Sequence, residues 1–162
     1  MAIPRPPLAL LGLEPLRAGY ELPSHAFTRN APAVQADSHP VIIFPGMAAS
    51  GLALAPSRRH CDRLGHAATD WRRGFNTGLQ AKLDDWLAEL AAQTTDMLAP
   101  CDQSAMRIAW SLGGLYAREL AERLGQRVRQ VTTLGTPFNA GADHTRVGWM
   151  YWMLSDAAPA FS

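Results

Sequence analysis

Short β-prone segments recur along the middle of the chain, separated by longer stretches with helical or loop character. The segments are 41–44, 66–69, 106–110 and 128–134. Uninterrupted apolar runs such as Val-Ile-Ile-Phe at 41–44 are typical of strands that are buried on both faces of a sheet. The pattern therefore predicts four strands, each ended by a loop or by the start of a helix.

Helical spacing of apolar side chains appears between these strands. One predicted helix spans 56–64. A clearer amphipathic helix begins at Leu79 and is ended by Pro100, with its charged residues on the faces away from the apolar stripe. A third helix spans 112–124 and follows the strand 106–110 almost directly. This alternation predicts an α/β fold with a doubly wound, mostly parallel sheet and helices on both faces.

The predicted core occupies 39–141. Residues 1–38 are rich in Pro and Ala and are predicted to form an N-terminal arm or capping helix, while 142–162 is predicted to begin a lid or cap segment. A parallel sheet that ended at 128–134 would expose an apolar edge, which would allow self-association. We therefore expect the sequence to be a fragment or shortened product of a longer protein.

Composition describes a folded globular protein, with 48% hydrophobic and 18% charged residues among 162. The formal charge of +1 gives no reason to expect nucleic acid as a partner. No apolar run approaches the roughly 20 residues of a membrane span, and the apolar patch at 8–13 is short for a secretory signal. Cytoplasmic location is the resulting expectation. Cys61 and Cys101 are expected to be reduced, buried or half-buried thiols.

Ser111 lies at the junction of a predicted strand and a predicted helix, between the small residues Ala109 and Gly113. A strand that leads straight into a helix forces the corner residue into a strained conformation and pushes its side chain outward, an arrangement called a nucleophile elbow. The usual motif has Gly where this chain has Ala109. A serine that merely caps a helix is the alternative, but the small flanking residues and the preceding strand favour the elbow.

Acyl transfer by a serine needs a hydroxyl, a base, a group that orients the base, and backbone donors for the developing oxyanion. Ser111 supplies the hydroxyl, and the N–H of Leu112 is one predicted donor, because it begins a helix whose positive end points the same way. The second predicted donor is the N–H of Met47, in the loop that follows the strand 41–44. This chemistry requires no metal and no cofactor.

Three blocks of sequence, 41–47, 108–114 and 131–138, resemble the N-terminal part of an α/β-hydrolase, close to the bacterial lipase-like and esterase-like members. The segment 74–78 stands where such proteins have a glycine-rich loop over the site. The resemblance implies a serine hydrolase that acts on a small-molecule or lipid-like carboxylic ester with an apolar acyl group.

The acid and the histidine of α/β-hydrolases come after the elbow. Here Asp143 and His144 are the candidates, but neighbours on one short loop could hardly orient each other along a line to Ser111. The other histidines precede the elbow and are expected at the surface or in loops: His25, His39, His60 and His66. Two hypotheses stay open, an esterase whose base comes from elsewhere and a non-catalytic α/β-hydrolase-like scaffold.

Overall fold

The computed structural model describes residues 37–80, 82–101 and 103–136, together with Leu13 and Leu16. The chain divides into two compact units, Met1–Val34 and Gln35–Ser162. In the first unit the two described leucines are helical and exposed. The described strands belong to the second unit. The predicted lid at 142–162 lies outside the described residues, and so does most of the predicted arm at 1–38.

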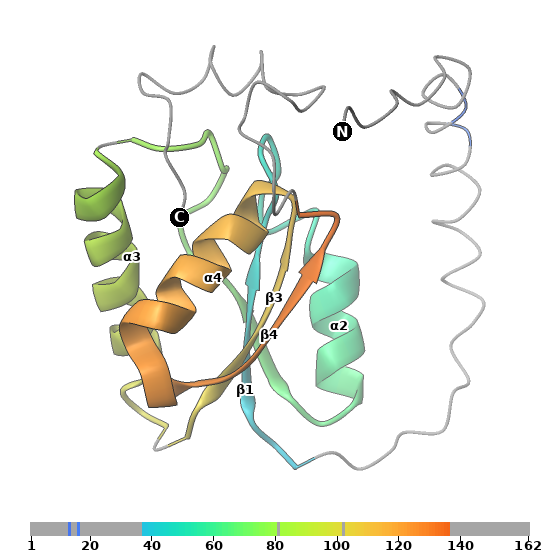
Figure 1. Ribbon diagram of the computed structural model, residues 1–162. Coiled ribbons are helices and arrows are strands. Elements are labelled where there is room, and N and C mark those ends of the chain that lie inside the picture. Colours follow the sequence, from blue (N-terminus) through green and yellow to red (C-terminus); the bar gives the residue numbers. More distant parts are fainter. Residues whose placement is uncertain (1–12, 14–15, 17–36, 81, 102, 137–162) are drawn as a thin grey trace, which may run out of the picture. The chain divides into compact units, whose positions relative to one another are not determined.

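Four parallel strands form the sheet of the second unit (Figure 1). They are β1 (Pro40–Phe44), β2 (Ala67–Asp70), β3 (Ala105–Trp110) and β4 (Val128–Leu134). Their order across the sheet is β2-β1-β3-β4, and every neighbouring pair is parallel. The four predicted strands are confirmed, each within one residue of its predicted bounds. Because the strands are parallel, the loops that follow them gather at one edge of the sheet, here called the carboxyl edge.

Helices fill the crossovers between the strands. They are α2 (Ala55–Arg63), α3 (Leu83–Leu98) and α4 (Leu112–Leu124), and a short 3₁₀ turn, η1 (Gly125–Arg127), leads into β4. The bounds predicted for α2 and α4 are confirmed to within one residue. None of the described helices is long and apolar enough to cross a bilayer.

The predicted start of α3 at Leu79 is wrong. The helix begins at Leu83, after Lys82, whose ψ of 143° is extended. Leu79 is nevertheless buried, because the preceding loop folds back into the core after Gly78, which has a φ of 96°. A loop leucine four positions before Leu83 matches helical spacing, so the apolar periodicity extended the predicted helix too far.

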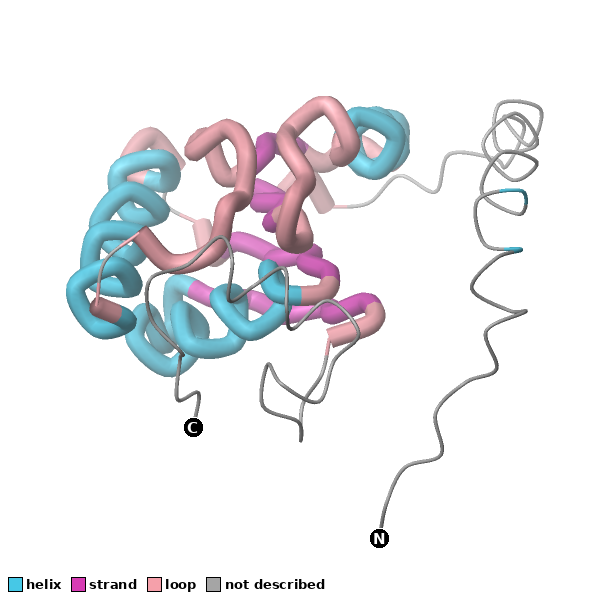
Figure 2. Tube along the Cα trace, turned by 90° about the horizontal axis from the view of Figure 1, so that it is seen from above, coloured by secondary structure: helices cyan, strands magenta, loops and turns pink. Residues whose placement is uncertain are grey.

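The sheet lies between two helical layers, with α2 on one face and α3 and α4 on the other (Figures 1 and 2). Successive residues of β1 alternate between these layers. Ile42 and Phe44 join the cluster that contains α3 and α4, whereas Val41 and Ile43 join the cluster that contains α2. All five residues of β1 are buried, as the uninterrupted apolar run predicts. The doubly wound α/β architecture is therefore confirmed.

Arg107 is a charged residue inside this core. It occupies an inward position of β3 between Ala105 and Ala109, and its side chain has no exposed surface. Neither Nε nor the two terminal nitrogens of its guanidinium has a hydrogen-bond partner among the described residues. Burial lowers the pKa of Arg107 to about 10, because a charged group is costly outside water. At neutral pH the folded and unfolded states both keep the charge, so the cost of burying it is fully present.

Replacing Arg107 with methionine is expected to raise the free energy of unfolding by about 2 kcal/mol, because an apolar chain of similar length removes an unpaired buried charge. Urea unfolding at neutral pH measures the change. Arg127→Met at an exposed position of η1 is the matched control, with an expected change within about 0.5 kcal/mol. A marked loss of stability in Arg107→Met alone would contradict the interpretation and indicate a partner outside the described residues.

Candidate active site

Ser111 forms the corner between β3 and α4. Its φ of 52° and ψ of −128° lie where residues other than glycine are strained. The Ser111 side chain makes no capping hydrogen bond to α4. The alternative of a simple helix-capping serine is therefore wrong, and the backbone has the strained corner conformation that the sequence predicts for an elbow.

The end of β4 holds the backbone of this corner. The N–H of Ser111 donates to the carbonyl of Leu134 at 3.0 Å. The carbonyl of Ser111 accepts from the N–H of Gly114 at 3.0 Å and from the hydroxyl of Thr136 at 3.1 Å. Both backbone polar groups of the strained residue are thus engaged, which stabilises a conformation that would be costly in isolation.

Replacing Thr136 with valine is expected to lower the free energy of unfolding by about 1 kcal/mol, because the change removes the hydroxyl that bonds Ser111 while keeping the side-chain shape. Thr133→Val is the matched control: Thr133 is half-buried in β4 and should change stability by less than about 0.5 kcal/mol. Chemical denaturation of both variants checks this. Equal losses in the two would show that the bond to Ser111 contributes nothing.

The loop after β1 lies directly against the corner. A Cβ placed on Gly46 would stand 3.1 Å from Cβ of Ser111, and one placed on Gly113 would stand 2.5 Å from the carbonyl oxygen of Pro45. Only glycine fits at Gly113 without a shift of backbone. The structure thus brings together the loop that contains Met47, the side chain of Ser111 and the first turn of α4.

The amide N–H groups of Met47 and Leu112 are the two predicted oxyanion donors. Within the described part of the chain, neither N–H donates to a backbone carbonyl. For Leu112 this follows from its place at the start of α4, since the first N–H groups of a helix have no partner inside it. These groups carry the partial positive charge of the helix end. Both predicted oxyanion donors therefore come from segments that adjoin Ser111.

The described histidines lie away from Ser111. His39 and His66 directly precede β1 and β2, so they lie at the opposite edge of the sheet, where their rings stand 4.2 Å apart. His39 is buried there, with 8% of its surface exposed. His60 is exposed on α2. The predicted acid and base, Asp143 and His144, lie outside the described residues.

The sequence does not predict the contacts of two residues near the corner. Thr136 lies in the block 131–138, which carries no signal for the hydrogen bond from its hydroxyl to the carbonyl of Ser111. Asn76 belongs to the segment 74–78, which the sequence predicts as a glycine-rich loop. In the structure it is fully buried, and its side-chain Nδ2 donates to the carbonyl of Pro45 at 2.9 Å. In the sequence, each is a polar residue flanked by turn-forming residues, and this pattern does not identify a hydrogen-bond partner that is distant along the chain.

A solved structure has a fold similar to that of this chain. A lipase from Bacillus licheniformis, solved in its propeptide form, matches with a TM-score of 0.53 and 21% sequence identity, over 76% of this chain and 27% of that chain. The fold is that of an α/β-hydrolase. The fold that the sequence blocks imply by resemblance is thereby confirmed.

A second α/β-hydrolase of known structure is an extracellular protein from a Paenibacillus species. It matches with a TM-score of 0.49 and 13% identity, over 68% of this chain and 48% of that chain. The chain therefore spans about half the length of one of these proteins and about a quarter of the other. No protein-family profile and no curated protein matches the sequence.

Proposed function

We propose that the protein hydrolyses carboxylic esters through an acyl-enzyme formed on Ser111. The strained corner at Ser111, with a hydroxyl that caps no helix, is the observation that carries the proposal. Oγ of Ser111 attacks the ester carbonyl carbon and gives up its proton to a base. The bond to the alcohol oxygen then breaks, and the alcohol leaves with a proton. Water attacks the acyl-enzyme in the same way and releases the acid.

The N–H groups of Met47 and Leu112 stabilise the negative charge that develops on the carbonyl oxygen in each step. Two observations support this role. Neither N–H donates to a backbone carbonyl among the described residues. Leu112 follows Ser111 in the chain, and Met47 follows Gly46, which lies against the side chain of Ser111. Fixed donors of this kind stabilise the transition state more than the ground state, since the charge appears only there.

The substrate is an ester with an apolar acyl group, either a small molecule or a lipid-like compound. Three large apolar side chains are exposed on segments that end at the carboxyl edge: Leu52 at 86%, Phe75 at 52% and Leu134 at 53%. Exposed apolar side chains on these segments favour a ligand that is apolar next to its ester bond.

A histidine base for Ser111 comes from outside the described residues, because His39 and His66 lie at the opposite edge of the sheet and His60 is exposed on α2. Asp143 and His144 are the candidates within the sequence. The same observation favours a second function, a non-catalytic α/β-hydrolase-like scaffold in which Ser111 lacks a proton acceptor.

Hydrolysis of p-nitrophenyl esters of graded acyl length distinguishes the two functions. If the protein is an esterase, the rate of hydrolysis should rise from the acetate to longer acyl esters and should be lost in Ser111→Ala. Folded protein with no hydrolysis that depends on Ser111 would support the scaffold and contradict the esterase. Circular dichroism of both samples establishes that they are folded.

A further inference from the structure

Asn76 is a fully buried polar residue in the segment between β2 and α3. Every type of hydrogen-bonding group it carries is engaged. Its side-chain Nδ2 donates to the carbonyl of Pro45 at 2.9 Å, and its Oδ1 accepts from the N–H of Gly78 at 3.1 Å. Its own carbonyl accepts from Ala48 N–H at 2.8 Å, and its N–H donates to the carbonyl of Ala49 at 2.8 Å.

Three of these four bonds reach the loop after β1, at Pro45, Ala48 and Ala49, which lie on both sides of Met47 in the sequence. The carbonyl of Pro45 belongs to the peptide group just before the one that contains Met47 N–H, and Ala48 N–H belongs to the peptide group just after it. Both flanking peptide planes are therefore fixed by the same residue. Ala48 has a φ of 57°, a conformation that an alanine adopts only when its surroundings hold it there.

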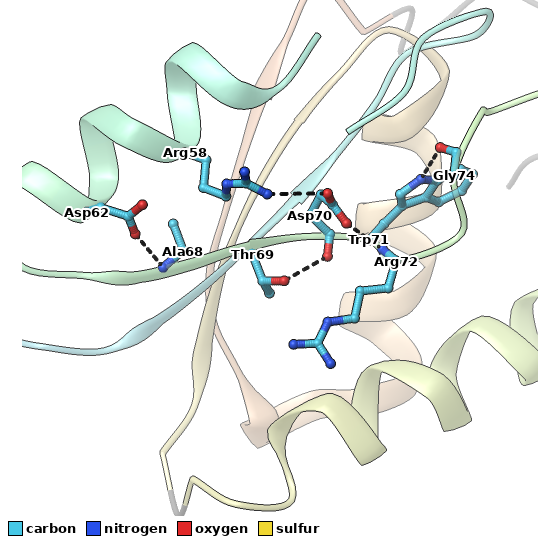
Figure 3. Close-up of polar contacts among 8 residues, drawn as sticks. All are labelled: Arg58, Asp62, Ala68, Thr69, Asp70, Trp71, Arg72 and Gly74. Atoms are coloured by element: carbon cyan, nitrogen blue, oxygen red, sulfur yellow. Dashed lines mark hydrogen bonds and ion pairs between the residues drawn. The ribbon is translucent and has the colours of Figure 1, made fainter. Parts of the chain in front are cut away.

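The start of the segment that carries Asn76 is itself held in place (Figure 3). The carboxylate of Asp70, at the end of β2, accepts from the backbone N–H of Arg72 at 2.9 Å and lies 3.5 Å from the guanidinium of Arg58 on α2. The indole N–H of Trp71 donates to the carbonyl of Gly74 at 3.0 Å. The segment before Asn76 is thus fixed by hydrogen bonds, and Asn76 connects this segment to the loop after β1.

We propose that Asn76 is a positioning residue that holds the N–H of Met47 in the direction needed to bind the oxyanion. The inference rests on the proposed function, because it assigns Asn76 an effect on a transition state that forms at Ser111. Asn76 itself does not touch the reacting atoms. It acts through the two peptide planes on either side of the donor. Without these bonds, the peptide group of Met47 N–H keeps, among the described residues, only the longer bond from Ala49 N–H to the carbonyl of Gly46, at 3.3 Å.

Asn76→Asp is the most direct test, because it keeps the size of the side chain and the acceptor for Gly78 but removes the donor to Pro45. Asn76→Ser removes the same bond without adding a charge, and it serves if the aspartate variant does not fold. Thr94→Val is the control: its hydroxyl is buried and donates to the carbonyl of Leu90 at 2.7 Å on α3, so it also loses one buried hydrogen bond.

Steady-state hydrolysis of a p-nitrophenyl ester is measured for each variant, together with deuterium exchange of the peptide that contains 45–49. The Asn76 variants should lose about 10- to 100-fold in kcat with KM changed less than about threefold. Exchange at Ala48 N–H should rise about tenfold or more. The control should change neither. A rise in KM with kcat unchanged overturns the proposal. A kcat equal to that of the control also overturns it.

Failure of the proposed function gives a different result. If wild-type protein shows no hydrolysis that Ser111→Ala removes, the esterase proposal fails and with it the catalytic part of this inference. The exchange measurement still decides the structural part: faster exchange in the Asn76 variants and not in the control supports the positioning of the loop, and unchanged exchange overturns it.

Discussion

Replacing Ser111 with alanine or with glycine is expected to lower the rate of ester hydrolysis by about 10⁴-fold or more, because either change removes the attacking oxygen. The two variants should nevertheless differ in stability. The φ of 52° and ψ of −128° at Ser111 strain any residue that has a Cβ, but not glycine. Ser111→Gly should therefore unfold with a free energy about 1 kcal/mol higher than that of Ser111→Ala.

Ser57 on α2 provides the control pair, since it lies within a regular helix. There the order should reverse, with the glycine variant less stable than the alanine variant by about 1 kcal/mol. Urea unfolding of the four proteins measures both differences. A glycine variant at Ser111 that is less stable than the alanine variant would show that the corner is not strained, whatever the activity proves to be.

Gly113→Ala is expected to lower the free energy of unfolding by about 2 kcal/mol and to reduce hydrolysis as well. The added Cβ would stand 2.5 Å from the carbonyl oxygen of Pro45 and 2.9 Å from that of Phe44. Both atoms belong to the backbone, so the contact cannot be relieved by rotating a side chain. Either α4 or the loop after β1 must move, and each movement separates Ser111 from the proposed donor at Met47.

The measurement combines urea unfolding with the kcat for a p-nitrophenyl ester. Alanine ordinarily stabilises a helix by up to about 1 kcal/mol relative to glycine, so a destabilised Gly113→Ala would be against the intrinsic preference. A variant that is as stable as wild type, with the same kcat, would show that the close approach of α4 to Pro45 is unimportant.

The sequence predicts most of the sheet because its signals are local. The apolar run of β1 and the direct junction of β3 with α4 each depend on residues that are adjacent along the chain. The predicted start of α3 is wrong because Leu79 is buried although it lies in a loop. An apolar residue at helical spacing does not distinguish a buried loop from the first turn of a helix.

The candidate site divides in the same way. Ser111 and Leu112 follow from one continuous motif, and Met47 is predicted as a donor from its place in the loop after the strand 41–44. Asn76 and Thr136 were missed because their partners lie 31 and 25 residues away, at Pro45 and Ser111. Such contacts form only once the parallel strands bring separate loops to one edge.

The buried charge of Arg107 was likewise not predicted, since an arginine within an otherwise apolar strand has no local signature of burial. Other expectations stay predictions: the roles of Asp143 and His144, self-association through an edge strand, and location in the cytoplasm.

Covalent modification of Ser111 tests the central claim most directly. The protein is incubated with a fluorophosphonate, and intact-mass and peptide mass spectrometry locate the adduct. An activated serine at the corner predicts one adduct per chain, on the peptide that contains Ser111, and none in folded Ser111→Ala. A folded wild-type protein that forms no adduct, or forms it equally in Ser111→Ala, would contradict the claim.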